Sequence, residues 1–315
     1  MTQGITTSSR QTRGQNQVWR KIKKSRWLYL MFLPVVAYYV IFQYMPMFGI
    51  VIAFKDYNAF IGVADSPWVG LKHFRSFFSS IYAPRLIRNT FLISFYGLIF
   101  GFPAPIMLAI LLNEIRDGFF KKTVQTISYL PHFVSTVIIV GMYVNFLSPS
   151  TGLINNIIEI LGGERTYFLN DPKYFRRLYT MMGIWAGVGW GSIIYLAALT
   201  GIDVELYEAC VIDGGGRIRQ TIHITLPGIA PTIVIMLIFR IGNLLSVGHE
   251  AILLMYSPAT YETADVISTY VYRRGLIEAD YSFSTAVGLF NSLVSLVLIT
   301  FANEVSKRFG ETSLW

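Results

Sequence analysis

The sequence predicts an all-α membrane protein with six transmembrane helices. Of its 315 residues, 53% are apolar and only 14% are charged, and the mean hydropathy is +0.50. A helix needs about 20 apolar residues to cross a bilayer, and because backbone groups cannot stay unpaired in lipid, apolar stretches of this length must be helices. Six stretches qualify, at about 28–51, 90–112, 123–146, 178–199, 229–248 and 283–302.

The N-terminal segment orients these spans. Residues 1–26 contain seven basic residues and no acid, which places this tail in the cytoplasm and argues against a nucleic-acid partner for the net charge of +8. The apolar run that follows is too long for the core of a signal peptide, and no small-residue cleavage pattern follows it. We therefore expect an uncleaved first helix with its outer loop over 27–83 and a core over 84–304. Since the span count is even, the tail 305–315 is also cytoplasmic.

The outer segments carry some order of their own. "PWVGLKHFRSFFSS", residues 67–80, has aromatic residues at helical spacing and predicts a short helix on the membrane surface. The second outer loop contains an amphipathic turn or two closed by Gly162 and Gly163, and the third, 249–280, is mostly polar. Cytoplasmic loops usually carry the excess of Lys and Arg. Several basic residues fall on the outer side and weaken the orientation inferred from this rule: Lys55, Lys72, Arg75, Arg85, Arg88, Arg176 and Arg177.

A compact polar segment, 203–231, separates the fourth and fifth spans on the cytoplasmic side. Asp203 is expected to cap a helix over 204–213, which Gly214 ends in a left-handed conformation. The next two glycines permit a reversal, and a second short helix over 217–224 is expected to stop ahead of Leu-Pro. Two short helices at an angle below the membrane are suited to docking into a groove on a cytoplasmic partner.

The residues of this elbow resemble a known family. "EACVIDGGGRIRQTIHITLPGIAP" is similar to the EAA loop of permease subunits in binding-protein-dependent ABC importers, with Cys210 in place of the second alanine and Thr221 where an aromatic residue is frequent. The form "YEAxxIDGxGR…HITLP" is most similar to maltose-type carbohydrate permeases. The positions expected to couple to the ATPase are Glu208, Ala209, Asp213, Gly214, Leu226 and Pro227.

The resemblance implies a type I importer fold and a set of partners. These are a second permease subunit of different sequence, two ATP-binding subunits, an extracellular or periplasmic solute-binding protein, and the lipid of a bacterial cytoplasmic membrane. The sequence has no Gly-x-x-x-x-Gly-Lys-Ser/Thr loop, and its four histidines are scattered, so we expect no ATPase site, metal or cofactor in this chain. ATP and Mg²⁺ would be bound by the partner ATPase subunits.

A solute path is expected along the fourth, fifth and sixth spans and the outer end of the third. Arg240 begins a polar series with spacing three on the fifth span, and a buried charge of this kind either faces a water-filled path or pairs with a backbone carbonyl. The resemblance maps the sugar site of related permeases to Ala186, Gly187 and Trp190. Asn243 and Ser246 continue the series that Arg240 begins. Polarity alone adds Asn291 and Ser292 on the sixth span, and Tyr143 and Asn145 could form part of a gate at the outer end of the third.

Three functions remain open at this point. The first is an ABC importer permease for a carbohydrate, expected to be an oligosaccharide. The second is an ABC permease for a non-sugar or anionic solute, such as a peptide, a phosphate ester or a uronate-containing sugar, which Arg240 keeps open. The third is a secondary transporter, which is disfavoured because the six spans contain no Asp or Glu for a proton relay.

Overall fold

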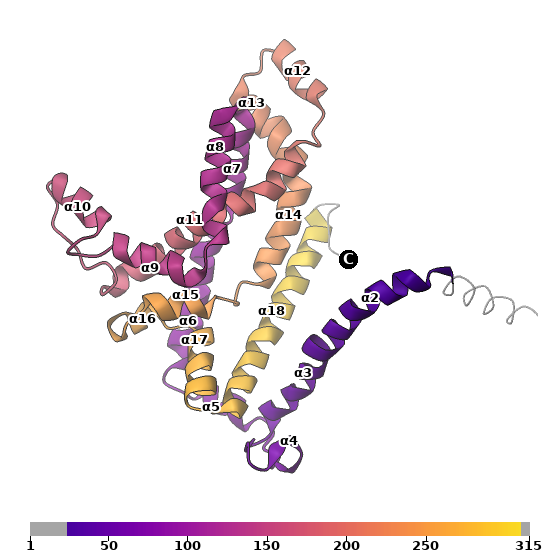
Figure 1. Ribbon diagram of the computed structural model, residues 1–315, viewed down its shortest axis with the longest axis vertical. Helices are drawn as coiled ribbons and strands as arrows, with labels where there is room; N and C mark the ends of the chain where they lie inside the picture. Colours follow the sequence, from indigo (N-terminus) through magenta and orange to yellow (C-terminus); the bar gives the residue numbers. More distant parts are fainter. Residues whose placement is uncertain (1–23, 310–315) are drawn as a thin grey trace, which may run out of the picture.

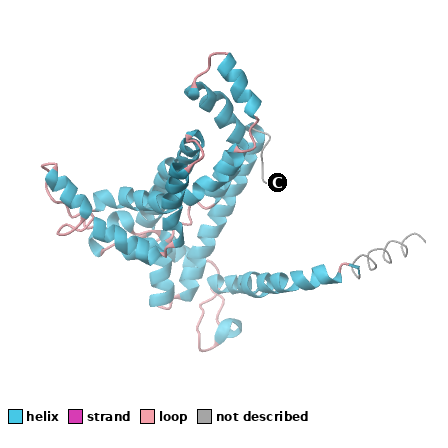
Figure 2. Ribbon diagram, turned by 45° about the horizontal axis from the view of Figure 1, so that its top comes forward, coloured by secondary structure: helices cyan, strands magenta, loops and turns pink. Residues whose placement is uncertain are grey.

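The computed structural model describes residues 24–309, which are helical apart from turns and one isolated bridge between Lys55 and Trp68 (Figures 1 and 2). Within this range, five continuous helices are long and apolar enough to cross a membrane, and one bent pair adds a sixth span when counted as one. This confirms the predicted fold class. Most of the two predicted tails, 1–23 and 310–315, lies outside the described residues.

The first span is a continuous helix, Arg26–Phe54, whose first part stands apart from the rest of the chain (Figure 1), while its last segment packs against the last helix. It comprises α2 (Arg26–Tyr39), a π turn (Val40–Tyr44), α3 (Met45–Met47) and a 3-10 segment (Phe48–Phe54). No residue of α2 is buried. A helix that is apolar on all sides requires lipid or another subunit around it.

The outer loop after this span packs against the last helix. It contains α4 (Gly62–Asp65) and α5 (Lys72–Phe78), within the predicted helix 67–80. Phe77 of α5 is buried, with its ring centroid 6.3 Å from that of Phe283 and 6.2 Å from that of Phe290. This helix therefore packs on the last helix through Phe77, and its place on the membrane surface stays a prediction.

The second span runs without a break through a proline. It is formed by α6 (Ala83–Tyr96), a π turn (Gly97–Gly101) and α7 (Pro103–Glu114). Proline lacks an N–H, and its ring collides with the carbonyl four residues back in a regular helix. Here the N–H of Phe102 bonds the carbonyl of Gly97, five residues back, at 3.0 Å, and this wider turn accommodates Pro103.

The third span is bent by 109°, where the sequence predicted one straight helix over 123–146. It consists of α8 (Phe119–Tyr129), a 3-10 turn (Leu130–Phe133) and α9 (Thr136–Phe146). Pro131 opens the 3-10 turn, and Val134 and Ser135 are extended, with ψ of 140° and 150°. Because proline removes one helical hydrogen bond, the helix is interrupted here and α9 points away from the axis of α8 (Figure 1).

The remaining spans are α11, α14 and α18. Their bounds, with those of the short outer helices, are α10 (Leu153–Ile160), α11 (Pro172–Leu199), α14 (Leu226–Gly242), α15 (His249–Met255), a 3-10 turn (Pro258–Thr260), α16 (Tyr261–Ala264), α17 (Ile267–Tyr272), a π turn (Arg273–Ile277) and α18 (Tyr281–Phe309). The fifth span ends at Gly242, six residues before the predicted end. Gly162 after α10 has φ of +83°, consistent with the expected glycine closure.

Side-chain contacts fix which ends of the helices lie together. Asn291 of α18 bonds the carbonyl of Leu245 at 3.3 Å, and Ile299 packs on Gly242, so α18 runs antiparallel to α14. The N–H of Tyr57, after the first span, bonds Ser282 at 2.9 Å. The first span therefore ends where α18 starts, and both helices have their terminal ends on the side of the 203–231 elbow, as an even span count requires.

Three buried clusters hold the bundle together. One joins α9, α11 and the third outer segment around Val140, Phe175 and Ile252. The second joins α5, α6, α17 and α18, and the third joins α7, α11 and α14 through Ala109, Tyr195, Leu199 and Ile229. The third outer segment is thus part of the core rather than a polar loop.

Candidate functional site

The first limb of the elbow is α12 (Val204–Ile212), and its capping follows the sequence prediction. The side chain of Asp203 accepts a hydrogen bond from the N–H of Glu205 at 3.0 Å. Gly214 ends the limb with φ of +75°, a conformation that other residues rarely adopt. The N–H of Gly215 bonds the carbonyl of Cys210 at 2.7 Å, and a Cβ on Gly215 would lie 2.8 Å from that oxygen.

The second limb continues into the fifth span. It comprises α13 (Arg217–Gln220) and a π turn (Thr221–Thr225) that leads directly into α14, so one helix runs from Arg217 to Gly242. The prediction that it stops before Pro227 is wrong. The N–H of Leu226 bonds the carbonyl of Thr221, five residues back, and the wide turn admits the proline ring.

Three contacts fasten the elbow to the spans on either side. The hydroxyls of Tyr207 and Thr225 lie 3.0 Å apart and join α12 to the base of α14. Arg217 lies 3.4 Å from the carboxylate of Glu114 at the end of α7. A Cβ on Gly228 would lie 2.6 Å from Ile202, so the end of α11 packs directly on α14. A force on α12 would therefore reach three spans.

The surface of the elbow is exposed and largely apolar. No residue of α12 is buried, and Ile212 is 85% exposed. The predicted coupling residues Glu208, Ala209, Asp213 and Gly214 are exposed on it, while Leu226 is half-buried and Pro227 exposed at the base of α14. Within residues 24–309, Glu208 has no hydrogen-bond or ion-pair partner. The apolar neighbours that sequence reasoning missed are all more than half exposed: Val204, Leu206, Val211, Ile212 and Ile218.

A cavity of about 550 Å³ lies between the second, fourth and fifth spans. Its walls come from α6 with its π turn, from α11, from α14 and from the turn after Gly242. None of its lining residues is an acid, and Arg240 carries the one charge among them. The other polar lining side chains are Ser94, Tyr179, Thr180, Tyr195, Asn243 and Ser246.

Arg240 extends across the cavity to the second span. A Cβ on Gly97 would lie 2.7 Å from its Nη2, so the guanidinium lies directly over the glycine. Gly97 is near the middle of the continuous helix Ala83–Glu114, which sets Arg240 at mid-height of that span. Among the described residues no carbonyl or carboxylate bonds Arg240. Of the two alternatives for this cation, the geometry favours the one that faces an open path.

The predicted path residues separate into two groups. Gly187, Arg240, Asn243 and Ser246 line the cavity together, although residues 243–248 form a turn rather than a helix. Trp190 instead stacks on His132, with ring centroids 4.2 Å apart. The other predicted residues also lie away from the lining. Ala186 and Tyr143 pack against the core between α9 and α11, and Asn145 is exposed on α9. The side chain of Ser292 bonds a carbonyl of its own helix, and that of Asn291 bonds the carbonyl of Leu245.

Sequence reasoning missed part of the wall formed by α11. Tyr179, Gly183, Gly187, Gly191 and Tyr195 all line the cavity. They recur every four residues, which places them along one face of a helix. This spacing of small residues between two tyrosines could have identified the face, whereas Trp190 lies off it.

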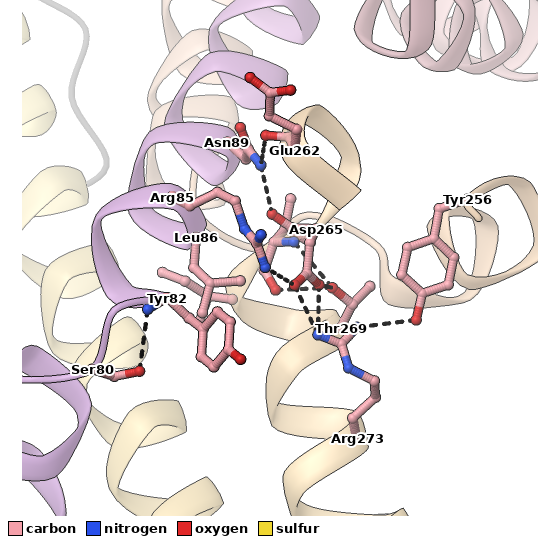
Figure 3. Close-up of polar contacts among 12 residues, drawn as sticks. Ser80, Tyr82, Arg85, Leu86, Asn89, Tyr256, Glu262, Asp265, Thr269 and Arg273 are labelled. Atoms are coloured by element: carbon pink, nitrogen blue, oxygen red, sulfur yellow. Dashed lines mark hydrogen bonds and ion pairs between the residues drawn. The ribbon is translucent and has the colours of Figure 1, made fainter. Parts of the chain in front are cut away.

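A buried ion-pair network supports the outer end of the cavity (Figure 3). Asp265 is fully buried and bonds Arg273, Thr269 and Arg85, while Asn89 of α6 donates to the carbonyls of Glu262 and Asp265, both at 2.9 Å. Burial disfavours the charge of Arg273, but hydrogen bonds to Asp265 and Tyr256 outweigh it and raise the pKa of Arg273. The network ties α16 and α17 to the second span.

The described residues offer no site for a metal ion, since no three His, Cys, Asp or Glu side chains lie together in that part of the chain.

Comparison with known proteins identifies the family. Residues 101–310 match the family model described as the binding-protein-dependent transport system inner membrane component. The chain is 45% identical to protein LplB of Bacillus subtilis, with 96% of each chain covered. It is 46% identical to the polygalacturonan/rhamnogalacturonan transport system permease protein YteP of Bacillus subtilis, with 94% of this chain and 92% of the relative covered.

A solved structure shares the fold. A chain of the bacterial alginate ABC transporter, crystallised in complex with an alginate pentasaccharide-bound periplasmic protein, superposes with a TM-score of 0.87. The two chains are 46% identical, with 95% of this chain and 100% of that chain covered. The secondary transporter considered above is thereby rejected. The chain belongs to the family of inner membrane components of binding-protein-dependent transport systems.

Proposed function

We propose that this chain forms part of the membrane path of an ABC importer for an acidic oligosaccharide, and that Arg240 is its anion-recognising residue. The observation that carries the proposal is the cation of Arg240, which has no partner among residues 24–309 and lies in a cavity with no lining acid. The names of similar proteins, which transport polygalacturonan or alginate, give the same class of solute.

The energetics favour an anionic ligand over a structural role. Placing an arginine at the centre of a bilayer-spanning helix costs roughly 2.5–3.5 kcal/mol on insertion scales, and such residues usually face a cavity or a partner. A carboxylate from the solute would pair with the guanidinium by charge-assisted hydrogen bonds. Because the acid would come from the cargo, the cavity needs none of its own.

The elbow would be the contact to the energy source. We propose that separate ATPase subunits bind α12 through its exposed apolar residues and Glu208, and that hydrolysis of ATP with Mg²⁺ takes place on those subunits. Their closure would move α14 and α7 through the contacts at Tyr207 and Arg217 and turn the cavity outward. A second permease of different sequence would complete the path in a bacterial inner membrane, and a solute-binding protein would deliver the sugar.

Uptake into liposomes that contain the assembled importer tests the proposal. With the solute-binding protein outside and ATP inside, we expect ATP-dependent uptake of tetragalacturonate or an alginate tetrasaccharide. A neutral tetrasaccharide such as maltotetraose and the phosphate ester glycerol 3-phosphate should not be transported. Uptake of the neutral sugar, or of glycerol 3-phosphate in place of both acidic sugars, would overturn the acidic-oligosaccharide assignment.

A further inference from the structure

We propose that Arg88 and Arg176 form a second, outer anion subsite, which holds one carboxylate of the acidic oligosaccharide while another carboxylate reaches Arg240. This inference rests on the proposed function and adds a location to it. It concerns two arginines at the outer ends of the second and fourth spans, which belong to none of the three buried clusters.

The side chain of Arg176 is held in place by a neutral partner. Its Nη2 donates to the Oδ1 of Asn89 at 2.8 Å. Asn89 is 1% exposed, and its amide nitrogen donates to the carbonyls of Glu262 and Asp265 at 2.9 Å each, which fixes the amide so that Oδ1 faces Arg176 (Figure 3 shows the Asn89 side chain among these carbonyls). The guanidinium is thus oriented without its charge being neutralised.

No carboxylate of the described residues neutralises the two arginines. Asp265, the buried acid beside Asn89, is already bonded to Arg273 at 2.8 and 2.9 Å and to Arg85 at 3.4 Å. Glu262 is exposed and exerts a weaker attraction on Arg176 from beyond ion-pair distance.

The two cations are also close enough to act on each other. Within residues 24–309 the Nε of Arg176 is buried with no hydrogen-bond partner, and the exposed Arg88 has no bonding partner. The positive charge of Arg88 repels that of Arg176. Two neighbouring cations without an acid favour an anion between them, since a shared carboxylate would relieve the repulsion and satisfy free donors.

Arg176, held by Asn89, lies in line with the cavity. Arg176 precedes Thr180 by one helical turn, and the hydroxyl of Thr180 bonds the carbonyl of Arg176 at 2.8 Å. On the second span, Asn89 is followed by Ser94, whose buried Oγ lines the cavity without a partner in the described part of the chain, and then by Gly97 beneath Arg240.

This order sets the spacing of the two subsites. Eight residues separate Asn89 from Gly97, and at 1.5 Å of rise per residue this gives about 12 Å along the helix. A chain of several uronates carries a carboxylate on every sugar and can engage both subsites. A disaccharide is too short to do so, and this difference in length provides a specific readout.

The test compares the uptake of oligosaccharides of different length by the reconstituted importer. For the double variant Arg88→Gln, Arg176→Gln we expect uptake of tetragalacturonate to fall by about tenfold and that of digalacturonate by less than about threefold, as a lost ion pair on the longer ligand requires. Arg176→Lys, which keeps the charge, should retain more uptake than Arg176→Gln. Arg177→Gln, the same charge change one residue along and exposed, is the matched control and should leave both rates unchanged.

Each outcome has one meaning. Equal loss for both sugar lengths, or a double variant that behaves like Arg177→Gln, overturns the outer subsite while leaving the proposed function in place. Failure of the double variant to copurify with the second permease assigns the pair to a subunit contact and also overturns it. Absence of any acidic-sugar uptake by the unmodified importer overturns the proposed function itself.

Discussion

The carboxylate of Asp265 is fully buried and accepts two hydrogen bonds from the guanidinium of Arg273, at 2.8 and 2.9 Å. This pair joins α17 to the outer end of the second span through Arg85 and Asn89. An ion pair removed from water is costly to break, because the remaining partner keeps its charge without compensation.

We predict that Asp265→Asn destabilises the chain by roughly 3 kcal/mol, since it leaves Arg273 half-buried and unpaired. Thermal unfolding of the purified importer should show a transition several degrees lower. Asp56→Asn is the matched control: Asp56 pairs with Lys72 at 2.8 Å, but both side chains are at least half exposed, so its loss should cost less than about 1 kcal/mol. Equal effects of the two substitutions would contradict a structural role for the buried pair.

The exposed acid of the elbow leads to the second prediction. Glu208→Lys should uncouple ATP hydrolysis from transport, because it reverses the charge at the centre of the apolar face of α12 without disturbing any internal contact. The measurement is the number of sugar molecules taken up per ATP hydrolysed. Glu205→Lys, one turn earlier on the same exposed helix, is the control and should cost at most about 1 kcal/mol of helix stability through the dipole. Normal coupling in Glu208→Lys would remove this residue from the ATPase contact.

The turn of the elbow supports a third prediction, based on three glycine substitutions. Gly214→Ala places a side chain at φ of +75° and should cost about 1–2 kcal/mol of local strain, so that coupling falls. Gly214→Asn should be tolerated better, because asparagine visits this conformation. Gly216→Ala has φ of −81° and open space around its Cβ, and should couple normally. If all three couple equally, the angle of the elbow does not matter for function.

The sequence predicted those features that depend on local residue chemistry. The Asp203 cap and the Gly214 turn follow from side-chain geometry and backbone freedom, and both are confirmed. The span positions follow from the length of each apolar run, and they deviate mainly at the ends. The fifth span starts at Arg217 rather than 229 because polar residues of the elbow continue its helix.

Features that depend on packing could not be predicted in this way. A helix end was predicted ahead of Pro227 and none at Pro103, yet both prolines follow a π turn that accommodates the ring within a continuous helix. A π turn has no strong residue signature, so the outcome depends on the surrounding helices. Similarly, the cavity lining comes from three spans distant in sequence, and the stacking of Trp190 on His132 could not be deduced from either residue alone.

A fourth prediction tests the charge in the cavity. Arg240→Gln should reduce uptake of an acidic oligosaccharide by about tenfold or more, as expected when a charged hydrogen-bond partner is lost. Arg240→Lys should retain part of the rate, because it keeps the charge but loses the planar pair of donors. Copurification with the ATPase subunits controls for assembly. Uptake by Arg240→Gln at the rate of the unmodified importer would return this residue to a packing role.

The last prediction separates the position of this charge from its presence. Gly97→Ala leaves Arg240 intact, but the new Cβ would lie 2.7 Å from Nη2, closer than such contacts permit, so the guanidinium must shift into the cavity. We expect uptake of an acidic sugar to change by several-fold while the stability changes by less than about 1 kcal/mol, since alanine favours a helix by that amount over glycine. Gly288→Ala in α18, with nothing within 4 Å of its Cβ, controls for the helix effect and should transport normally. If Gly97→Ala and Gly288→Ala transport alike, the location of the guanidinium over Gly97 has no bearing on the solute, and only its charge would remain to be explained.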